Sequence, residues 1–204
     1  MLLVYTAPDR QKQGAKLAGA LILSIPNLIT LARILLVPVM VWAITAGEMR
    51  IAFLLFLVAG LSDLVDGYLA KRFNMATELG AYLDPLADKA LIVSVYVTLG
   101  IAGAIPRWLV ILVVSRDIMI VSAIMLSWLV NKPVTLKPLT VSKLNTVAQI
   151  LLALVVLASL AFEYDAWWLI QGLTGLVAIL TLLSVGLYLR EWVRHINGTR
   201  AGPA

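Results

Sequence analysis

Six runs of mainly apolar residues, each about 20 residues long, constrain the fold of this chain more than any other feature. A helix of that length crosses the ~30 Å hydrocarbon core of a bilayer and satisfies its backbone hydrogen bonds internally. Hydrophobic residues make up 62% of the 204 residues and charged residues only 13%, which is outside the balance of a soluble domain. The sequence therefore predicts an all-α integral membrane protein.

The breaks between the apolar runs predict where the transmembrane helices end. Gly47 closes the first run, Gly103 and Pro106 separate the third from the fourth, and NKPVTLKPLTVSK (131–143) is the longest loop. We expect one domain, 1–204, with a lead-in over 1–26, a six-helix bundle over 27–190 and a tail over 191–204. The six transmembrane helices are expected at 27–46, 51–71, 83–103, 106–130, 143–162 and 167–190.

Basic residues predict the orientation of the bundle. Eleven of the sixteen Lys and Arg residues lie in the lead-in, the tail and the loops after the second and fourth helices, whereas Arg50 and Arg107 lie at the opposite ends. By the positive-inside rule, the N- and C-termini are both cytoplasmic. The net charge of +5 is then a feature of membrane topology, and we expect membrane lipids rather than nucleic acid as partners.

The lead-in bears on the cellular location of the protein, and the cysteine content excludes some kinds of site. The lead-in lacks a convincing small-residue cleavage site, so we expect a cytoplasmic lead-in, with a cleaved signal peptide as the alternative. The lack of a recognisable transit peptide and the compact chain favour a bacterial inner membrane as the location. The chain has no cysteine, which excludes thiolate metal sites and a cysteine nucleophile.

Four aspartates stand out in this apolar context. Asp63 and Asp66 are three apart near the cytoplasmic end of the second predicted helix, and Asp84 and Asp88 are four apart at the start of the third. Each pair shares a helix face, and the short loop makes the helices antiparallel neighbours, so the four carboxylates can converge. Such a cluster requires cations or protonation. Oxygen ligands without His or Cys suit Mg²⁺, Mn²⁺ or Ca²⁺, and four carboxylates are enough for two divalent ions.

Other classes of protein also place aspartates in membranes. A single intramembrane aspartate can be a structural hydrogen-bonding group or part of an ion path. A transporter more often places its carboxylates near the midplane between repeated halves, and this chain shows no internal repeat. A carboxylate-lined cation transporter and a non-catalytic membrane scaffold remain the alternatives from another class.

The aspartate spacing resembles a known family. Asp63-x-x-Asp66-Gly67-x-x-Ala70, followed by Gly80-x-x-x-Asp84-x-x-x-Asp88, is similar to the motif of the CDP-alcohol phosphotransferases, also called CDP-alcohol phosphatidyltransferases. Lys71 stands where that motif usually has arginine, and Arg72 follows, so both positions keep a positive charge. The family fold implied by the resemblance has six transmembrane helices with the active site open to the cytoplasmic interface.

The resemblance implies a reaction and a set of site residues. In this family an alcohol attacks the β-phosphorus of a CDP-linked donor and CMP leaves. Metal ions offset the charge on the leaving CMP, and a carboxylate takes the acceptor's proton. The implied cofactors are two divalent cations, Mg²⁺ or Mn²⁺, held by Asp63, Asp66, Asp84 and Asp88, with Asp88 as the catalytic base. The expected donor-binding residues are Asp63, Gly67, Ala70, Lys71, Arg72, Gly80 and Arg33.

Three basic residues have alternative interpretations. Arg33 either binds the donor's phosphates or balances the charge of the aspartates. Arg116, beside Asp117, lies too deep in the fourth helix to face lipid, so it either lines a cavity or pairs within the bundle, and we expect it to bind the acceptor's phosphate. Lys143, where the fifth helix enters the membrane, belongs by resemblance to the same anion pocket, unless it is an interfacial lysine that extends to the membrane surface.

The second half of the chain indicates which alcohol is the acceptor. SRDIMIVSAIM, LKPLTVSKLNTVAQILL and FEYD are more similar to the cardiolipin synthase branch of the family than to the branch that uses glycerol 3-phosphate. That similarity implies CDP-diacylglycerol as donor and phosphatidylglycerol as acceptor, with phosphatidylglycerophosphate synthesis from glycerol 3-phosphate as the alternative. Members of the family are commonly homodimers, so we expect a homodimer, and Gly and Ala along the third and fourth helices permit close packing.

Overall fold

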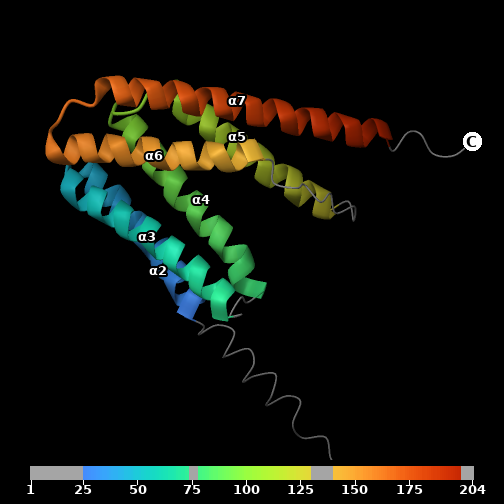
Figure 1. The fold of residues 1–204 in the computed structure, drawn as a ribbon, viewed down its shortest axis with the longest axis horizontal. Coiled ribbons are helices and arrows are strands. Elements are labelled where there is room, and N and C mark those ends of the chain that lie inside the picture. Colours follow the sequence, from blue (N-terminus) through green and yellow to red (C-terminus); the bar gives the residue numbers. More distant parts are fainter. Residues whose placement is uncertain (1–24, 74–77, 130–139, 199–204) are drawn as a thin grey trace, which may run out of the picture. The chain divides into compact units, whose positions relative to one another are not determined.

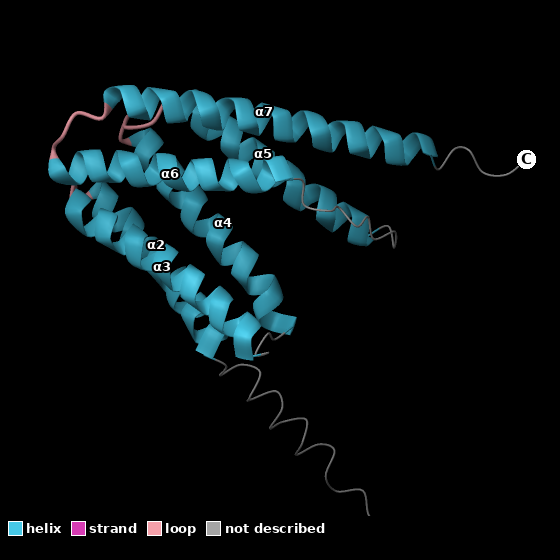
Figure 2. Cartoon of the chain, viewed as in Figure 1, coloured by secondary structure: helices cyan, strands magenta, loops and turns pink. Residues whose placement is uncertain are grey.

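The computed structural model of this chain describes residues 25–73, 78–129 and 140–198, and every regular element in these ranges is an α-helix. The predicted all-helical fold is therefore confirmed over that part of the chain, while most of the lead-in and of the 131–143 loop lies outside it. The helices are α2 (Ile25–Thr45), α3 (Met49–Phe73), α4 (Glu78–Ile101), α5 (Arg107–Leu129), α6 (Thr140–Phe162) and α7 (Trp167–Gly198). Short connections join α2 to α3, α4 to α5 and α6 to α7 (Figure 1, Figure 2).

Each predicted span corresponds to one helix, with two notable differences at the ends. Helix α4 begins at Glu78 rather than at residue 83, and α7 continues to Gly198 rather than ending at residue 190. The sequence prediction located apolar runs, but a helix extends beyond such a run wherever the following polar residues have adequate helix propensity. The apolar pattern thus predicted the number of helices better than their ends.

Glycines with positive φ end two of the helices. Gly47 follows α2 with φ 79°, and Gly103 follows α4 with φ 77°. This left-handed conformation is readily accessible to glycine, which lacks a Cβ, and it commonly terminates helices. Both glycines stand at positions where the sequence predicted a break.

The chain folds as two compact units, named here by their residues. Unit 1 comprises residues 1–40 and 55–91, which include most of α2, the second part of α3 and the first part of α4. Unit 2 comprises residues 41–54 and 92–204, which include the whole of α5, α6 and α7. Within unit 2, α6 packs along α7, and α5 also contacts α7 (Figure 1).

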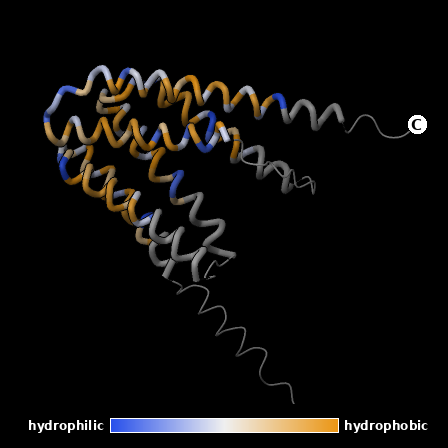
Figure 3. Tube along the Cα trace, viewed as in Figure 1, coloured by the Kyte–Doolittle hydropathy of each residue, from blue (hydrophilic) through white to orange (hydrophobic). Residues whose placement is uncertain are grey.

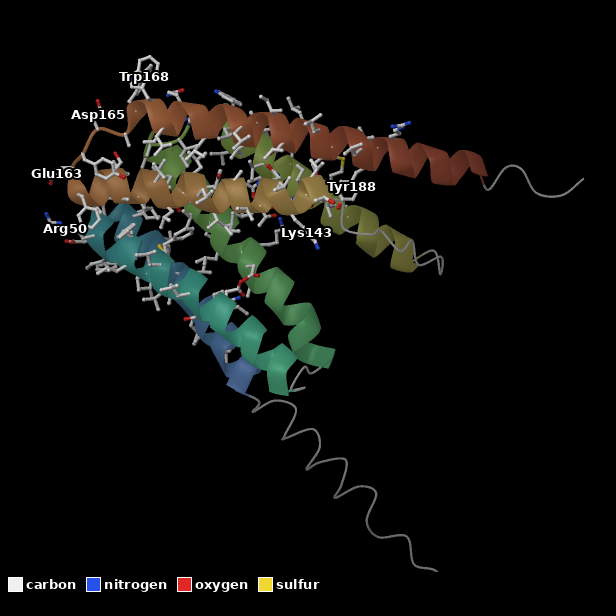
Figure 4. The ribbon with its side chains drawn as sticks, viewed as in Figure 1. Arg50, Lys143, Glu163, Asp165, Trp168 and Tyr188 are labelled. Atoms are coloured by element: carbon white, nitrogen blue, oxygen red, sulfur yellow. The ribbon has the colours of Figure 1, made fainter. Side chains whose placement is uncertain are left out.

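The connection between α6 and α7 in unit 2 is held by short-range contacts. The carboxylate of Asp165 accepts a hydrogen bond from the backbone N–H of Trp167 at 2.9 Å and so caps the first turn of α7. Ser159 Oγ donates to the carbonyl of Tyr164 at 2.7 Å. Figure 4 shows Glu163 and Asp165 at this connection.

Apolar side chains dominate both the interior and the surface. Leu99, Leu152 and Leu157 are fully buried in unit 2, whereas Ile111, Ile179 and Trp168 are mostly exposed. Figure 3 shows apolar residues along most of the described length of the helices. Over these ranges two helices are long and apolar enough to cross a membrane, Thr140–Phe162 and Trp167–Arg190. Six transmembrane helices with cytoplasmic termini stay a prediction.

Candidate active site

Three helices of unit 1 bring one charged residue each to the same point. Nη1 of Arg33, on α2, lies 2.9 Å from Oδ1 of Asp63, on α3. The same nitrogen donates a hydrogen bond to Oδ1 of Asp88, on α4, 55 positions away in the chain. The two carboxylates therefore converge on one guanidinium nitrogen.

Burial differs sharply within this group. The side chain of Arg33 is only 2% exposed, whereas those of Asp63 and Asp88 are 43% and 39% exposed. A buried guanidinium needs a compensating negative charge, and these carboxylates supply it. Because both carboxylates remain partly accessible, they can also contact a ligand from outside the bundle.

The other motif residues lie on the same helices. Asp66 is on α3, three positions after Asp63, and Asp84 is on α4, four positions before Asp88, so each shares a helix face with its partner in the motif. The structure describes only the helical backbone at seven motif positions, Asp66, Gly67, Ala70, Lys71, Arg72, Gly80 and Asp84. Among the side chains that are described, no group of three or more His, Cys, Asp or Glu residues is close enough to hold a metal ion.

The chemistry of the described carboxylates fits a divalent ion. Asp63 and Asp88 offer hard oxygen donors, and their shared contact with Arg33 brings their Oδ1 atoms to one point. Mg²⁺ and Mn²⁺ prefer such ligands, commonly with water or phosphate oxygens completing the coordination. The Asp63–Arg33–Asp88 group, named here the carboxylate cluster, is therefore the candidate active site.

Arg116 of α5 is the centre of a second polar group, in unit 2. Its Nη1 donates to the carboxylate of the adjacent Asp117. Its Nε and Nη2 donate to Oγ of Ser184 on α7, at 3.3 and 3.1 Å, and Nη2 also donates to Ser142 on α6. The side chains of Arg116 and Asp117 are 1% and 6% exposed. Of the two sequence interpretations, pairing within the bundle is the one observed, and the acceptor-phosphate role of Arg116 stays a prediction.

Lys143 lies in the first turn of α6 and is exposed (Figure 4). It directly follows Ser142, which is bonded to Arg116. An exposed cation at this position can reach an anion outside the bundle, whereas Arg116 is enclosed by its protein partners.

A polar face on α6 was not predicted from the sequence. Ser142, Asn145 and Gln149 recur at intervals of three and four, and a helix places such residues on one side. Asn145 Oδ1 accepts a hydrogen bond from Thr181 on α7 at 3.0 Å. Gln149 is fully buried, and neither polar atom of its amide has a hydrogen-bond partner among the described residues. The spacing was readable in the sequence, but Ser184, a lone serine in an apolar helix, carried no signal.

Comparison with known proteins identifies the family. The sequence profile of the CDP-alcohol phosphatidyltransferases matches residues 23–187, which is most of the chain. This chain belongs to the CDP-alcohol phosphatidyltransferase family. The profile spans the whole Asp63–Asp88 motif, so the family resemblance predicted from that motif is confirmed.

Several curated members of the family are similar over much of the chain. It is 34% identical over 194 residues to the CMP-forming cardiolipin synthase of Rattus norvegicus, covering 86% of this chain and 64% of the relative. The CMP-forming cardiolipin synthase of Homo sapiens is 35% identical over 181 residues, covering 81% of this chain and 60% of the relative. A probable phosphatidylglycerophosphate synthase of Mycobacterium tuberculosis is 36% identical over 119 residues, or 55% of this chain and 57% of the relative.

These relatives differ from this chain in length, and they come from different kinds of organism. The chain spans less than two thirds of the length of the mammalian cardiolipin synthases that it matches. Because the relatives come from mammals and from a bacterium, they do not favour a bacterial membrane over an organellar one.

Proposed function

We propose that this chain transfers the phosphatidyl group of CDP-diacylglycerol to phosphatidylglycerol, giving cardiolipin and CMP. Membership of the family supports phosphatidyl transfer from a CDP-linked donor. The two mammalian relatives, which match more than 80% of this chain, are CMP-forming cardiolipin synthases, which supports this product. The observation on the chain itself that carries the proposal is the convergence of Asp63 and Asp88, half exposed, on Arg33.

In the proposed reaction, Asp88 accepts the proton of the acceptor hydroxyl. The hydroxyl oxygen forms a bond to the β-phosphorus of the donor, and the bond from that phosphorus to the oxygen of CMP breaks. Asp63, Asp66, Asp84 and Asp88 are the residues that would hold two Mg²⁺ or Mn²⁺ ions. When bound, these ions supply positive charge that offsets the negative charge developing on the leaving CMP. A positioned carboxylate base typically contributes about 10² to 10⁴ in rate.

The remaining motif residues bind the donor in this proposal. Gly67, Ala70 and Gly80 are small, so the pyrophosphate can approach the backbone of α3 and α4 closely. Lys71 and Arg72 contribute positive charge toward the pyrophosphate. Arg33, bonded to two carboxylates, serves here chiefly to balance the charge of the cluster.

Two cations are proposed to bind the acceptor. Lys143 is exposed, so its ammonium can contact the phosphodiester of phosphatidylglycerol directly. Arg116 is 1% exposed and bonded to Ser142, Ser184 and Asp117, so its binding of that phosphate requires the ligand to reach a buried guanidinium. An alternative role for Arg116, fixing Ser142 next to Lys143, follows from the bond between Arg116 and Ser142.

The proposed setting is a membrane, with six transmembrane helices, cytoplasmic termini and a homodimeric assembly. The many exposed large apolar side chains support a lipid-facing surface, and two helices have the length and apolarity of transmembrane spans.

Phosphatidylglycerophosphate synthesis is the second candidate function. The similarity to the mycobacterial phosphatidylglycerophosphate synthase favours it, because identity over the matched segment is as high as for the cardiolipin synthases. In that case glycerol 3-phosphate replaces phosphatidylglycerol as acceptor, and the carboxylate cluster keeps the same role.

The test is product analysis by mass spectrometry with the purified chain, CDP-diacylglycerol and Mg²⁺ or Mn²⁺. Phosphatidylglycerol and glycerol 3-phosphate are supplied in separate reactions. We expect cardiolipin and CMP with phosphatidylglycerol only. Phosphatidylglycerophosphate from glycerol 3-phosphate alone would move the chain to the second function. No CMP with either acceptor would contradict both functions and favour the non-enzymatic classes.

A further inference from the structure

We propose that Arg33 is a built-in counter-cation of the carboxylate cluster, which holds Asp63 and Asp88 together before a divalent ion binds and lowers the affinity for that ion. The proposal rests on the metal-assisted function proposed above. It extends that function by assigning to an arginine outside the aspartate motif control over how strongly the motif binds metal.

The geometry shows how Arg33 links the helices. A single nitrogen, Nη1, contacts Asp63 on α3 and Asp88 on α4, while Arg33 itself is on α2. Two carboxylates that meet at one point repel each other, and a guanidinium between them offsets that repulsion. Unit 1 therefore has an ionic link between three helices that requires no metal.

The burial pattern explains why a metal ion does not simply replace Arg33. Its side chain is 2% exposed and lies beneath carboxylates that are 43% and 39% exposed. A divalent ion approaches the accessible sides of the carboxylates while the guanidinium remains buried below them. The ion then binds next to a fixed positive charge, which repels it and reduces its affinity.

Two other roles for Arg33 make different predictions. If Arg33 only binds the donor's phosphates, its removal changes donor binding and leaves metal binding unchanged. If Arg33 only fills space in the bundle, its removal destabilises the protein equally with and without metal. Only the counter-cation role predicts that the loss of stability depends on metal and that metal binding becomes tighter when Arg33 is removed.

The experiment measures Mn²⁺ binding by electron paramagnetic resonance on the full chain in detergent, with no CDP-diacylglycerol present. We expect Arg33→Gln to bind Mn²⁺ about tenfold more tightly than wild type, because a positive charge beside the ligands is removed. We also expect the melting temperature of Arg33→Gln to fall in EDTA and to recover largely in saturating Mn²⁺, because an ion that binds only the folded state stabilises it.

Arg50→Gln is the matched control. Arg50 belongs to unit 2, where its Nε donates to the backbone carbonyl of Ala161 at 3.1 Å (Figure 4). This variant should bind Mn²⁺ as wild type does, and any change in its melting temperature should be the same in EDTA and in Mn²⁺. A second variant, Arg33→Lys, keeps the charge and should have Mn²⁺ affinity within about twofold of wild type.

Several outcomes would overturn the proposal. Unchanged or weaker Mn²⁺ binding by Arg33→Gln would do so, as would equal losses of melting temperature with and without Mn²⁺. If Arg33→Gln folds neither in EDTA nor in Mn²⁺, the Mn²⁺ affinity of Arg33→Lys decides. An affinity equal to that of wild type would support the role of the charge, and tenfold tighter binding would contradict it. CMP release by wild type separates this proposal from the proposed function. If wild type releases CMP and Arg33→Gln has unchanged Mn²⁺ affinity, only the counter-cation role is rejected. If wild type neither releases CMP nor binds Mn²⁺, both proposals are rejected.

Discussion

Arg33 in unit 1 and Arg116 in unit 2 are both buried arginines of an apolar helical protein, with side chains 2% and 1% exposed, but their partners differ. Arg33 contacts two carboxylates that are about 40% exposed and come from two other helices. Arg116 bonds to the buried carboxylate of its neighbour Asp117 and to the hydroxyls of Ser142 and Ser184. Burial of the arginine is thus the same in both regions, and exposure of the partners distinguishes them.

This difference indicates what each group can do. The partners of Arg116, buried Asp117 and Ser184 and part-buried Ser142, offset the cost of desolvating its guanidinium, and these bonds stabilise the packing of α5, α6 and α7. A guanidinium beneath half-exposed carboxylates leaves those carboxylates accessible to a ligand. The comparison therefore assigns a mainly structural role to the Arg116 group and a ligand-binding role to the carboxylate cluster, and four substitutions can break or sharpen it.

The largest effect is expected in unit 1. Asp88→Asn removes the proposed base and a metal ligand, so CMP release should fall by about 10³-fold, within the range for general base catalysis. A coupled assay of CMP with saturating phosphatidylglycerol measures it. Asp165→Asn, at the first turn of α7, is the matched control and should keep wild-type activity. Activity of Asp88→Asn within tenfold of wild type would remove the carboxylate cluster from the reaction.

The next effect is expected in unit 2, on stability. Arg116→Met removes the cation beside buried Asp117, and the free energy of unfolding should fall by about 3 kcal/mol. Thermal unfolding in detergent measures it. The double variant Arg116→Met/Asp117→Leu should recover much of the loss, because both charges are then removed. The comparison breaks if Arg116→Met unfolds like wild type but raises the KM for the acceptor, since Arg116 would then act at the acceptor site alone, without the structural role.

Gln149 tests whether the polar face of α6 is needed for folding. Its buried amide has no partner among the residues the structure describes, so Gln149→Met should raise the free energy of unfolding by about 1 kcal/mol. Asn145→Leu is the contrasting variant and should lower the unfolding free energy, because the hydroxyl of Thr181 loses its acceptor. A destabilised Gln149→Met would show that the amide has a partner beyond the described residues.

The smallest effect is expected for the exposed cation. Lys143→Gln should raise the KM for phosphatidylglycerol about fivefold with little change in kcat, because an accessible charge contributes mainly to binding. Steady-state kinetics with mixed micelles measures both constants. Arg107→Gln, an exposed cation at the start of α5, should leave the KM unchanged. Equal increases in both variants would point to general surface charge rather than to a site at Lys143.

Much of the fold was predictable because long apolar helices have a strong sequence signal. The lengths of the apolar runs predicted every helix of the described structure, and the positive φ of Gly47 and Gly103 explains why two of these runs end where they do. The extension of α7 beyond residue 190 was not predicted, because polar residues lengthen a helix without extending its apolar run.

The candidate site was predictable only in part. The spacings of Asp63 and Asp66 and of Asp84 and Asp88 placed each pair on one helix face, which local helix geometry determines. The short loop between the two helices indicated that the pairs can converge. The choice between donor binding and charge balance for Arg33 depended on how α2 is rotated against α3 and α4, which tertiary packing determines. The partners of Arg116 could not be predicted for the same reason, since Ser142 and Ser184 lie 26 and 68 positions away from it in the sequence.

The most direct test of the proposed function is the origin of the two phosphatidyl groups in the product. The purified chain is given unlabelled CDP-diacylglycerol and phosphatidylglycerol with deuterated acyl chains, and cardiolipin and CMP are quantified by mass spectrometry. We predict one CMP per cardiolipin, and cardiolipin that carries the deuterated chains of a single phosphatidylglycerol. Cardiolipin built from two deuterated phosphatidylglycerols without release of CMP would contradict transfer from CDP-diacylglycerol.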